Sequence, residues 1–264
     1  MKPEISILLP SIRNDRLPAF YSSIAASTKR SFELIVVGPH NLPGMLLGAM
    51  NVKHVRDFGS PNRAQCIALS LAEGDIVTWL TDDAMLLPGA IDAHIELLRV
   101  MGNDCRNVIV GRYREGSSDH ERALVHPDVY FQVVGSPASS SHITDGTWLF
   151  NVAFVHRQIF DDLGGFDPRF EGTWCAHTDL AIRAQELIHA HVQMSGIELM
   201  VCDHMPGTSG DHRPIHECQL GHDEPLIQSI YRDPDWKSKR KAYIDPSSWK
   251  SEQTIWNRRF GQAN

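Results

Sequence analysis

Two kinds of hydrophobic pattern alternate along the first 112 residues of the chain. Short, nearly continuous apolar runs are typical of buried strands, whereas apolar residues that recur every three or four positions are typical of helices. These patterns predict strands at 5–9, 32–37, 52–55, 75–80 and 108–110, and helices at 16–26, at 62–71 and from about Pro88 onward. The alternation predicts an α/β fold with a mostly parallel central sheet flanked by helices.

The pattern changes in the second half of the chain. The remaining expected elements are an alternating strand at 129–133, a Ser- and Gly-rich loop at 135–146, a core strand at 148–155, a helix at 178–190 and a strand at 197–202. No segment has the composition of a linker, so we expect a single domain over residues 1–230. A basic and aromatic extension follows over residues 231–264.

The expected strand at 75–80 ends in the polar sequence Thr81-Asp82-Asp83. Ligands of open α/β sheets bind beyond the carboxyl ends of the strands. Two adjacent carboxylates at such a position suit Mg²⁺ or Mn²⁺, which prefer oxygen ligands and often share them with a substrate phosphate. The alternative is a pair of solvated turn residues, because Asp is common where strands end.

Composition excludes several classes of function. The chain has 264 residues and a formal net charge of -7 at pH 7, which argues against a nucleic-acid-binding surface. Its five Cys residues are odd in number and lack CxxC spacing, so we expect reduced thiols and a cytoplasmic location. We expect neither a signal peptide nor a membrane span, because no apolar stretch approaches roughly 18 residues.

Six short motifs follow one another in a recognisable order. They are Ile5–Ser11, Phe32–Val37, Ala72–Asp83, Leu86–Ile91, Leu163–Phe170 and Asp179–Arg183. This ordered set resembles family 2 glycosyltransferases, which have the GT-A fold. The resemblance spans residues 5 to 183 and implies a nucleotide-binding half at 1–112 followed by an acceptor-binding half at 113–230.

The resemblance implies transfer of a sugar from a nucleoside-diphosphate sugar to a hydroxyl group of a glycan or lipid-linked acceptor, with inversion at the anomeric carbon. A divalent cation, Mn²⁺ or Mg²⁺, would neutralise the charge of the leaving diphosphate. The implied donor-binding residues are Pro10, Ser11, Arg13, Asp57, Arg63, Asp82 and Asp83, and the implied metal ligands are Asp83 and His204.

Three positions depart from the family pattern or leave alternatives open. Thr81 stands where the DxD-like motif has its first Asp, which weakens ribose recognition at that position. The second expected strand is followed by Gly38 and Pro39 in place of Asp, so Asp57 becomes the candidate for the nucleobase contact, with a solvated loop residue as the alternative. His204 could bind Mn²⁺ through a neutral ring nitrogen or be a simple loop histidine.

The catalytic base is the least determined part of the site. An inverting transfer needs a group that accepts the proton of the acceptor hydroxyl. The family has an acidic pair just before the late helix, where this chain has Ala176 and His177. His177 and Asp179 are therefore both candidates for the base, and a third possibility is that neither serves.

Two further stretches carry residues that could bind a metal ion or contact a membrane. His212, His216, Cys218 and His222 could build a zinc site, or they could belong to a polar loop that folds over the donor. The extension at 231–264 mixes basic and aromatic residues, which suits peripheral contact with an anionic membrane or a tail that wraps the domain. The sequence gives no indication of the oligomeric state.

Two other functions remain as alternatives. A nucleotidyltransferase also joins an α/β sheet to metal-binding carboxylates, but it normally has a Gly-rich phosphate loop, and residues 10–14 contain no Gly. A glycosyltransferase-like domain that binds a nucleotide-sugar or a glycan without turnover is favoured by the altered residues at Thr81, Ala176 and His177. Nucleotide binding that requires Mn²⁺, together with slow donor hydrolysis, would distinguish an enzyme from such a binding domain.

Overall fold

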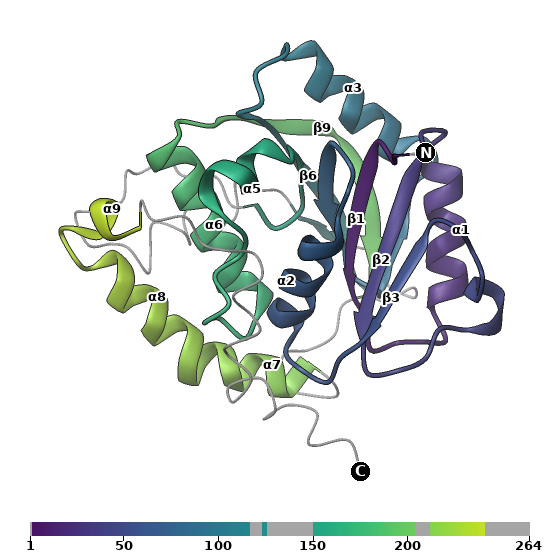
Figure 1. Ribbon diagram of the computed structural model, residues 1–264, viewed down its shortest axis with the longest axis horizontal. Coiled ribbons are helices and arrows are strands. Elements are labelled where there is room, and N and C mark those ends of the chain that lie inside the picture. The colour runs from purple at the N-terminus through teal and green to yellow at the C-terminus, as the bar shows by residue number, and fades with distance from the viewer. Residues whose placement is uncertain (1, 117–122, 126–149, 204–211, 241–264) are drawn as a thin grey trace.

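The computed structural model describes residues 2–116, 123–125, 150–203 and 212–240. The expected strand at 129–133, the Ser- and Gly-rich loop, His204 and the extension beyond residue 240 lie outside these ranges. Within them the chain folds into one α/β domain, built around a twisted sheet with helices on both faces (Figure 1).

Among the described residues the sheet has nine strands. They are β1 (Ile5–Pro10), β2 (Phe32–Gly38), β3 (Val52–Arg56), β4 (Ile76–Trp79), β5 (Ala84–Leu86), β6 (Asn107–Glu115), β7 (Ala123–Val125), β8 (Ala153–His156) and β9 (His191–Cys202). Eight of them follow the order β3-β2-β1-β4-β8-β6-β9-β5, and β7 pairs with β6. The α/β class with helices on both sides of a central sheet is therefore confirmed.

The two halves of the sheet differ in strand direction. β3, β2, β1 and β4 are parallel to one another, so their carboxyl ends reach the same edge. β8 runs antiparallel to both of its neighbours, β4 and β6, whereas β6 and β9 are again parallel. The parallel arrangement predicted for the first half is thus followed by a mixed half.

The helices are α1 (Leu17–Ser27), α2 (Pro61–Leu71), α3 (Ala90–Val100), α5 (Gln158–Leu163), α6 (Thr173–Leu187), α7 (Arg213–Cys218), α8 (Glu224–Tyr231) and α9 (Trp236–Lys239), with a short 3-10 turn η1 (Gly44–Leu46) and a π-helical turn η3 (Gln219–Asp223). Ser60 caps α2 because its side chain accepts the backbone N–H of Arg63 at 3.2 Å, and Pro61 occupies the first turn.

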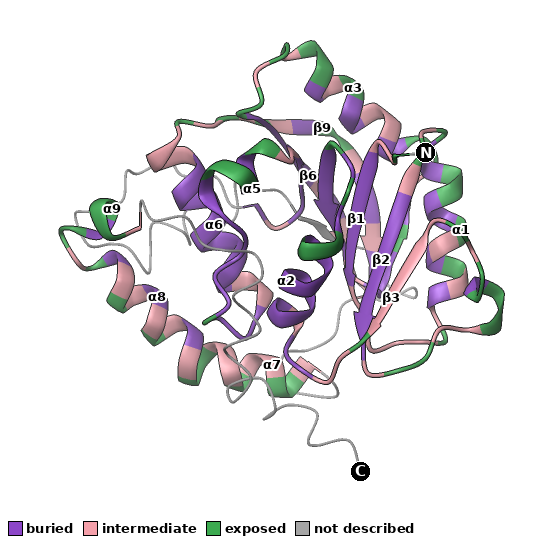
Figure 2. Ribbon diagram, viewed as in Figure 1, coloured by how far each residue is buried: buried purple, intermediate pink, exposed green. Residues whose placement is uncertain are grey.

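The side chains of the central strands alternate between two cores. Strand β1 and most of β2 are buried (Figure 2). Along β1, Ile7 and Leu9 pack with α1 and α3, whereas Leu8 packs with α2, α5 and α6 on the other face. Since both faces are covered, these strands are apolar at nearly every position, which explains their continuous hydrophobic runs.

Helix α6 begins earlier than the sequence predicts. It starts at Thr173 rather than at 178, so Asp179 lies in the interior of the helix and not in its first turn. The expected start of this helix at 178 is therefore wrong. The early turns escaped prediction because Gly172 caps the helix without any side-chain hydrogen bond.

The segment after residue 212 is helical and packs against α6. Trp236, in the first residues of the expected extension, is 2% exposed and lies edge-on against Tyr231. Arg240 forms ion pairs with Asp179 on α6 and with Asp167 in the turn between α5 and α6, which ties the segment to this part of the domain. Residues 231–240 thus wrap the domain.

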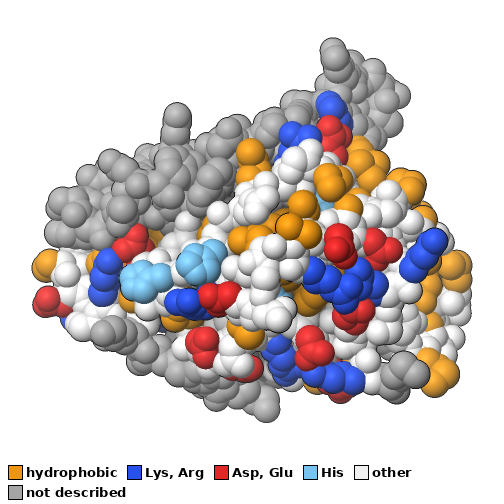
Figure 3. Space-filling view, turned by 90° about the horizontal axis from the view of Figure 1, so that it is seen from above, with side chains coloured by type: hydrophobic (Ala, Val, Ile, Leu, Met, Phe, Trp, Pro, Cys, Tyr) orange, Lys and Arg blue, Asp and Glu red, His pale blue; other side chains and the backbone are white. Residues whose placement is uncertain are grey.

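The surface carries charges of both signs. Lys and Arg side chains are interspersed with Asp and Glu over one face of the molecule (Figure 3). None of the helices in the described part of the chain has the length and hydropathy needed to cross a membrane.

Candidate functional site

A pocket of about 500 Å³ opens at the carboxyl ends of β1, β2 and β4. This is the edge at which ligands of open α/β sheets bind. Of the residues predicted for the site, the structure brings together in its lining Pro10, Ser11, Arg13, Asp57, Asp82, Asp83 and His177. Arg63 and Asp179 are not among the lining residues, and His204 lies outside the described part of the chain.

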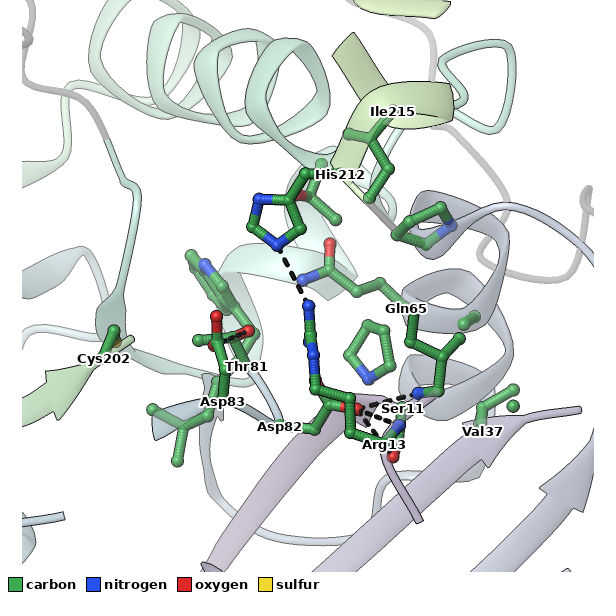
Figure 4. Close-up of a pocket in the computed structure, with 18 of the residues that line it drawn as sticks. Ser11, Arg13, Val37, Gln65, Thr81, Asp82, Asp83, Cys202, His212 and Ile215 are labelled. Carbon is green, nitrogen blue, oxygen red and sulfur yellow. Dashed lines mark hydrogen bonds and ion pairs between the residues drawn. The ribbon is translucent and has the colours of Figure 1, made fainter. Parts of the chain in front are cut away.

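Asp82 fastens the loop that follows β1 (Figure 4). One of its carboxylate oxygens accepts the Ser11 hydroxyl at 3.0 Å and the backbone N–H groups of Ile12 and Arg13 at 2.8 and 2.7 Å. The other oxygen accepts the Arg13 guanidinium. Asp82 is 3% exposed. Its first task is therefore to fix the shape of the loop at 10–13, which forms one wall of the pocket.

Asp83 is the carboxylate best suited to a cation. One of its oxygens accepts the Thr81 hydroxyl at 2.5 Å, and the side chain lines the pocket at 9% exposure. Burial raises the pKa of Asp83, and the neighbouring Asp82 raises it further, while the Thr81 hydroxyl and the charge of Arg13 partly oppose this effect. A cation on Asp83 would relieve the cost of holding a negative charge there.

The wall of the pocket is rich in carboxylates. Five line it, namely Asp57, Asp82, Asp83, Glu115 and Asp203, with the single guanidinium of Arg13 among the lining residues. Three of these carboxylates have guanidinium partners, namely Asp57 with Arg63, Asp82 with Arg13 and Asp203 with Arg16. A cation bound with a nucleoside diphosphate would therefore chiefly balance the charge of Asp83. Hard oxygen ligands of this kind match the preference of Mg²⁺ and Mn²⁺, so the donor set fits the group.

Asp57 and Arg63 act as a pair. The Arg63 Nε donates to both oxygens of Asp57, at 2.9 and 3.0 Å, and the backbone N–H of Gly59 donates to Asp57 at 2.8 Å. Asp57 faces the pocket, whereas Arg63 supports it from α2. Arg63 therefore reaches a ligand only through Asp57 in this arrangement.

His177 lies in the pocket wall but is buried, with 4% exposure. Its ring packs against Trp79 and Phe166, and its Nε2 lies 2.9 Å from the side-chain oxygen of Gln65. That oxygen accepts a hydrogen bond, so Nε2 carries the proton and Nδ1 keeps its lone pair. Burial lowers the pKa of His177 to about 3, so the ring is neutral at ordinary pH.

Asp179 lies in a sealed ion-pair network. It is fully buried and accepts the Arg183 Nε at 2.8 Å, the Tyr231 hydroxyl at 2.7 Å and the guanidinium of Arg240. These contacts occupy both carboxylate oxygens on a side of α6 that does not line the pocket. The geometry therefore does not support Asp179 as the base, and of the two candidates only His177 lines the pocket.

The sequence reading missed several residues of the pocket. Glu115 was missed because β6 continues to 115 instead of ending at 110, and its polar end gave no hydrophobic signal. Asp203 pairs with Arg16 at 2.6 Å, and its N–H bonds the backbone oxygen of Asp83 at 3.3 Å. His212, by contrast, was named in the sequence as part of either a zinc site or a polar loop over the donor, and it lines the pocket 3.0 Å from the Arg13 guanidinium, across from β4 (Figure 4).

No family model and no curated protein sequence matches the chain. Solved structures do match it. The structure of residues 1–349 of S. aureus TarS superposes with a TM-score of 0.54 and 13% identity, covering 91% of this chain and 73% of that chain. The structure of the same protein in complex with UDP has a TM-score of 0.54 and 13% identity, covering 89% of this chain and 72% of that chain. A longer TarS structure has a TM-score of 0.53 and 13% identity, covering 89% of this chain and 44% of that chain. At this identity the similarity shows the fold alone, and that fold is a GT-A-like glycosyltransferase fold.

Proposed function

We propose that the chain is a cation-dependent, inverting glycosyltransferase of the family 2 type that uses a nucleoside-diphosphate sugar, with UDP as the first nucleotide to test. The observation that carries the proposal is the position of Asp83 in the pocket wall, at the end of β4 and beside the loop held by Asp82. The UDP complex of TarS supports a uridine nucleotide donor for a protein of this fold.

Each part of the pocket has a task in this proposal. Asp83 would hold Mn²⁺ or Mg²⁺, which would neutralise the negative charge of the departing diphosphate. Asp57, held rigidly by Arg63, would contact the nucleobase or ribose at the end of β3. The acceptor, a glycan or a lipid-linked sugar, would enter between His177 and the ends of β6 and β9.

His177 is the group best placed to receive the acceptor proton. The acceptor oxygen would attack the anomeric carbon as the bond to the diphosphate breaks, and the proton of the hydroxyl would pass to Nδ1 of His177. Nδ1 has no hydrogen-bond partner among the described residues, and Gln65 fixes the tautomer that leaves its lone pair unshared; because Nδ1 is buried in the free protein, the ring must turn toward the pocket for an acceptor hydroxyl to reach it.

The decisive experiment is calorimetric titration of UDP into the protein with and without Mn²⁺. We expect binding that requires the metal in the wild type and at least about a hundredfold weaker binding in Asp83→Asn, because the cation loses its main ligand. Asp75→Asn is the matched control, since Asp75 precedes the other end of β4 and pairs with Lys2 at the surface. Metal-dependent binding that survives unchanged in Asp83→Asn would refute the assignment.

One observation favours a second candidate, a domain that binds a nucleotide-sugar without turnover. The low pKa of His177, about 3, makes it a weak base in the free protein. Release of UDP from donor sugars in the presence of Mn²⁺, above the rate in buffer, would support the enzyme. Metal-dependent UDP binding without any release, over a panel of donors and acceptors, would support the binding domain.

A further inference from the structure

Outside the pocket, three side chains with metal-binding chemistry meet beside the start of α6. Glu171, Cys218 and His222 each offer a ligand atom, and these atoms lie within 4.8 Å of one another. They come from three separate elements: the turn before α6, the end of α7 and the π-helical turn η3. Glu171 is 2% exposed, so the group is set into the domain and is not a surface cluster.

The hydrogen bonding of His222 is that of a metal ligand. Its Nδ1 lies 2.8 Å from the carboxylate of Asp223, which is fully buried. Asp223 is itself fixed, because its two oxygens accept the backbone N–H groups of Glu171 at 3.0 Å and Gly172 at 2.6 Å. A carboxylate on one ring nitrogen directs the lone pair of the other nitrogen outward, as in carboxylate–histidine–metal arrangements. Nε2 of His222 is thus left for a ligand.

Cys218 and Glu171 are in direct contact. The Cys218 sulfur lies 2.7 Å from one carboxylate oxygen of Glu171. A thiolate and a carboxylate at this separation repel each other strongly unless a cation lies between them. The same pair therefore becomes favourable when a metal ion binds and displaces the thiol proton.

The backbone conformation beside these three residues is also unusual. A π-helical turn at Gln219–Asp223 separates Cys218 from Glu224, and it carries both His222 and its carboxylate partner. Single π-turns are rare and are frequently found at functional sites. Cys218 and His222, four residues apart, lie on the same side of this segment, beside Glu171.

We propose that Glu171, Cys218 and His222 form a zinc site, with water as the fourth ligand. Sulfur, imidazole and carboxylate together match Zn²⁺, whereas Mg²⁺ and Mn²⁺ are poorly matched to a thiolate ligand. This site is distinct from Asp83, which belongs to a set of oxygen ligands. The proposal is independent of glycosyl transfer.

The position of the site gives it a structural consequence. Pro214 and Ile215, on α7, line the pocket, and Cys218 ends the same helix. Glu171 lies two residues before α6, the helix that carries His177. A zinc ion would therefore fasten the α7 wall of the pocket to the base of α6.

The first test is zinc binding to the whole chain, freed of metal with a chelator and titrated with Zn²⁺ against a coloured competitor. We expect one tightly bound ion per chain and a rise in melting temperature, because the metal binds the folded state. With Co²⁺ as the probe, a thiolate-to-cobalt charge-transfer band should appear. An absent band, or zinc binding no tighter than that of the Cys218→Ala variant, would overturn the proposal.

Variants locate the ligands. Cys218→Ala and His222→Gln should each weaken zinc binding by more than the roughly 10- to 100-fold typical of lost outer-shell partners, and should abolish or shift the cobalt spectrum. Matched controls are Cys105→Ala, an exposed free thiol, and His216→Gln, on the same helix but outside the group. Asp83→Asn should also bind zinc normally. If the controls lose as much affinity as the ligand variants, the ion is held elsewhere.

Alkylation offers a test within a single molecule, without any mutation. Cys218 is half-buried and Cys105 is exposed, whereas the other three thiols are buried. Zinc should slow modification of Cys218 by iodoacetamide and leave that of Cys105 unchanged, as measured by peptide mass spectrometry. Equal rates for Cys218 with and without zinc would contradict a metal–sulfur bond.

Discussion

Asp83 and Asp179 are both buried carboxylates, but their surroundings differ in kind. Asp179 is fully buried and accepts hydrogen bonds from Arg183, Tyr231 and Arg240. Asp83 accepts a side-chain hydrogen bond from the Thr81 hydroxyl and faces a pocket. The comparison teaches that burial alone does not mark a functional carboxylate. What matters is whether the protein itself supplies the compensating charge or leaves that to a ligand.

Removing the charge of Asp179 should change stability more than any other substitution considered below. Asp179→Asn should lower the free energy of unfolding by about 3–5 kcal/mol, because Arg183 and Arg240 are left buried without their counter-charge. Urea unfolding measures this loss. Glu217→Gln, which breaks an exposed pair with Arg213 on α7, is the control and should cost less than about 0.5 kcal/mol. Unchanged stability with lost turnover would return Asp179 to the role of base.

Replacing the His177 ring should lower turnover. His177→Gln keeps a donor for the Gln65 oxygen but removes the basic ring nitrogen. We expect kcat to fall by about a hundredfold, the usual scale of a lost general base, with KM for the donor nearly unchanged. His191→Gln, at the exposed start of β9, is the control. Near-normal kcat in His177→Gln would place the base elsewhere in the pocket.

A third prediction concerns acid stability. The pKa of His177 is lowered by burial from 6.5 to about 3, so the unfolded chain binds a proton there that the folded chain does not. Stability should therefore fall as the pH drops from about 6.5 toward 3, by up to roughly 1.4 kcal/mol per pH unit from this one group. The wild type should lose more stability than His177→Gln between pH 7 and pH 5 in urea titrations. Identical losses would show that the ring is accessible to protons.

Removing the charge of Asp83, in contrast to that of Asp179, should change stability only slightly. Asp83→Asn should leave the metal-free protein as stable as the wild type or raise its stability by less than about 1 kcal/mol, because the raised pKa of Asp83 means that its charge is unfavourable there. Thermal unfolding without divalent cations measures it. A large loss of stability would mean that Asp83, like Asp179, is a structural partner.

The first half of the fold was predictable from the sequence for a physical reason. Its strands are buried on both faces, so their apolar runs are continuous and their ends fall within a few residues of the observed ones. The carboxylates of Asp82 and Asp83 could be placed at the pocket because parallel strands end at one edge. No such rule fixes the second half, where α6 lacks a capping side chain and α7, with six residues, is too short to show a helical period.

The parts of the site that escaped prediction depend on contacts between distant segments. Asp179 resembles a helix-start carboxylate in sequence, and only the fold brings Tyr231 and Arg240 onto it. Glu171 and Cys218 are 47 residues apart, so no spacing rule joins them. Sequence patterns indicate which residues have useful chemistry, whereas the tertiary packing decides which of them share a site.

The clamp of Asp82 on the loop after β1 has a consequence for binding kinetics. Because Ile12 and Arg13 are already held by their backbone N–H groups, the wall that would face a diphosphate exists before any ligand arrives. Little ordering entropy is then lost on association, and capture of a nucleotide should be limited by diffusion and by the entry of its counter-ion, with no slow rearrangement of this loop.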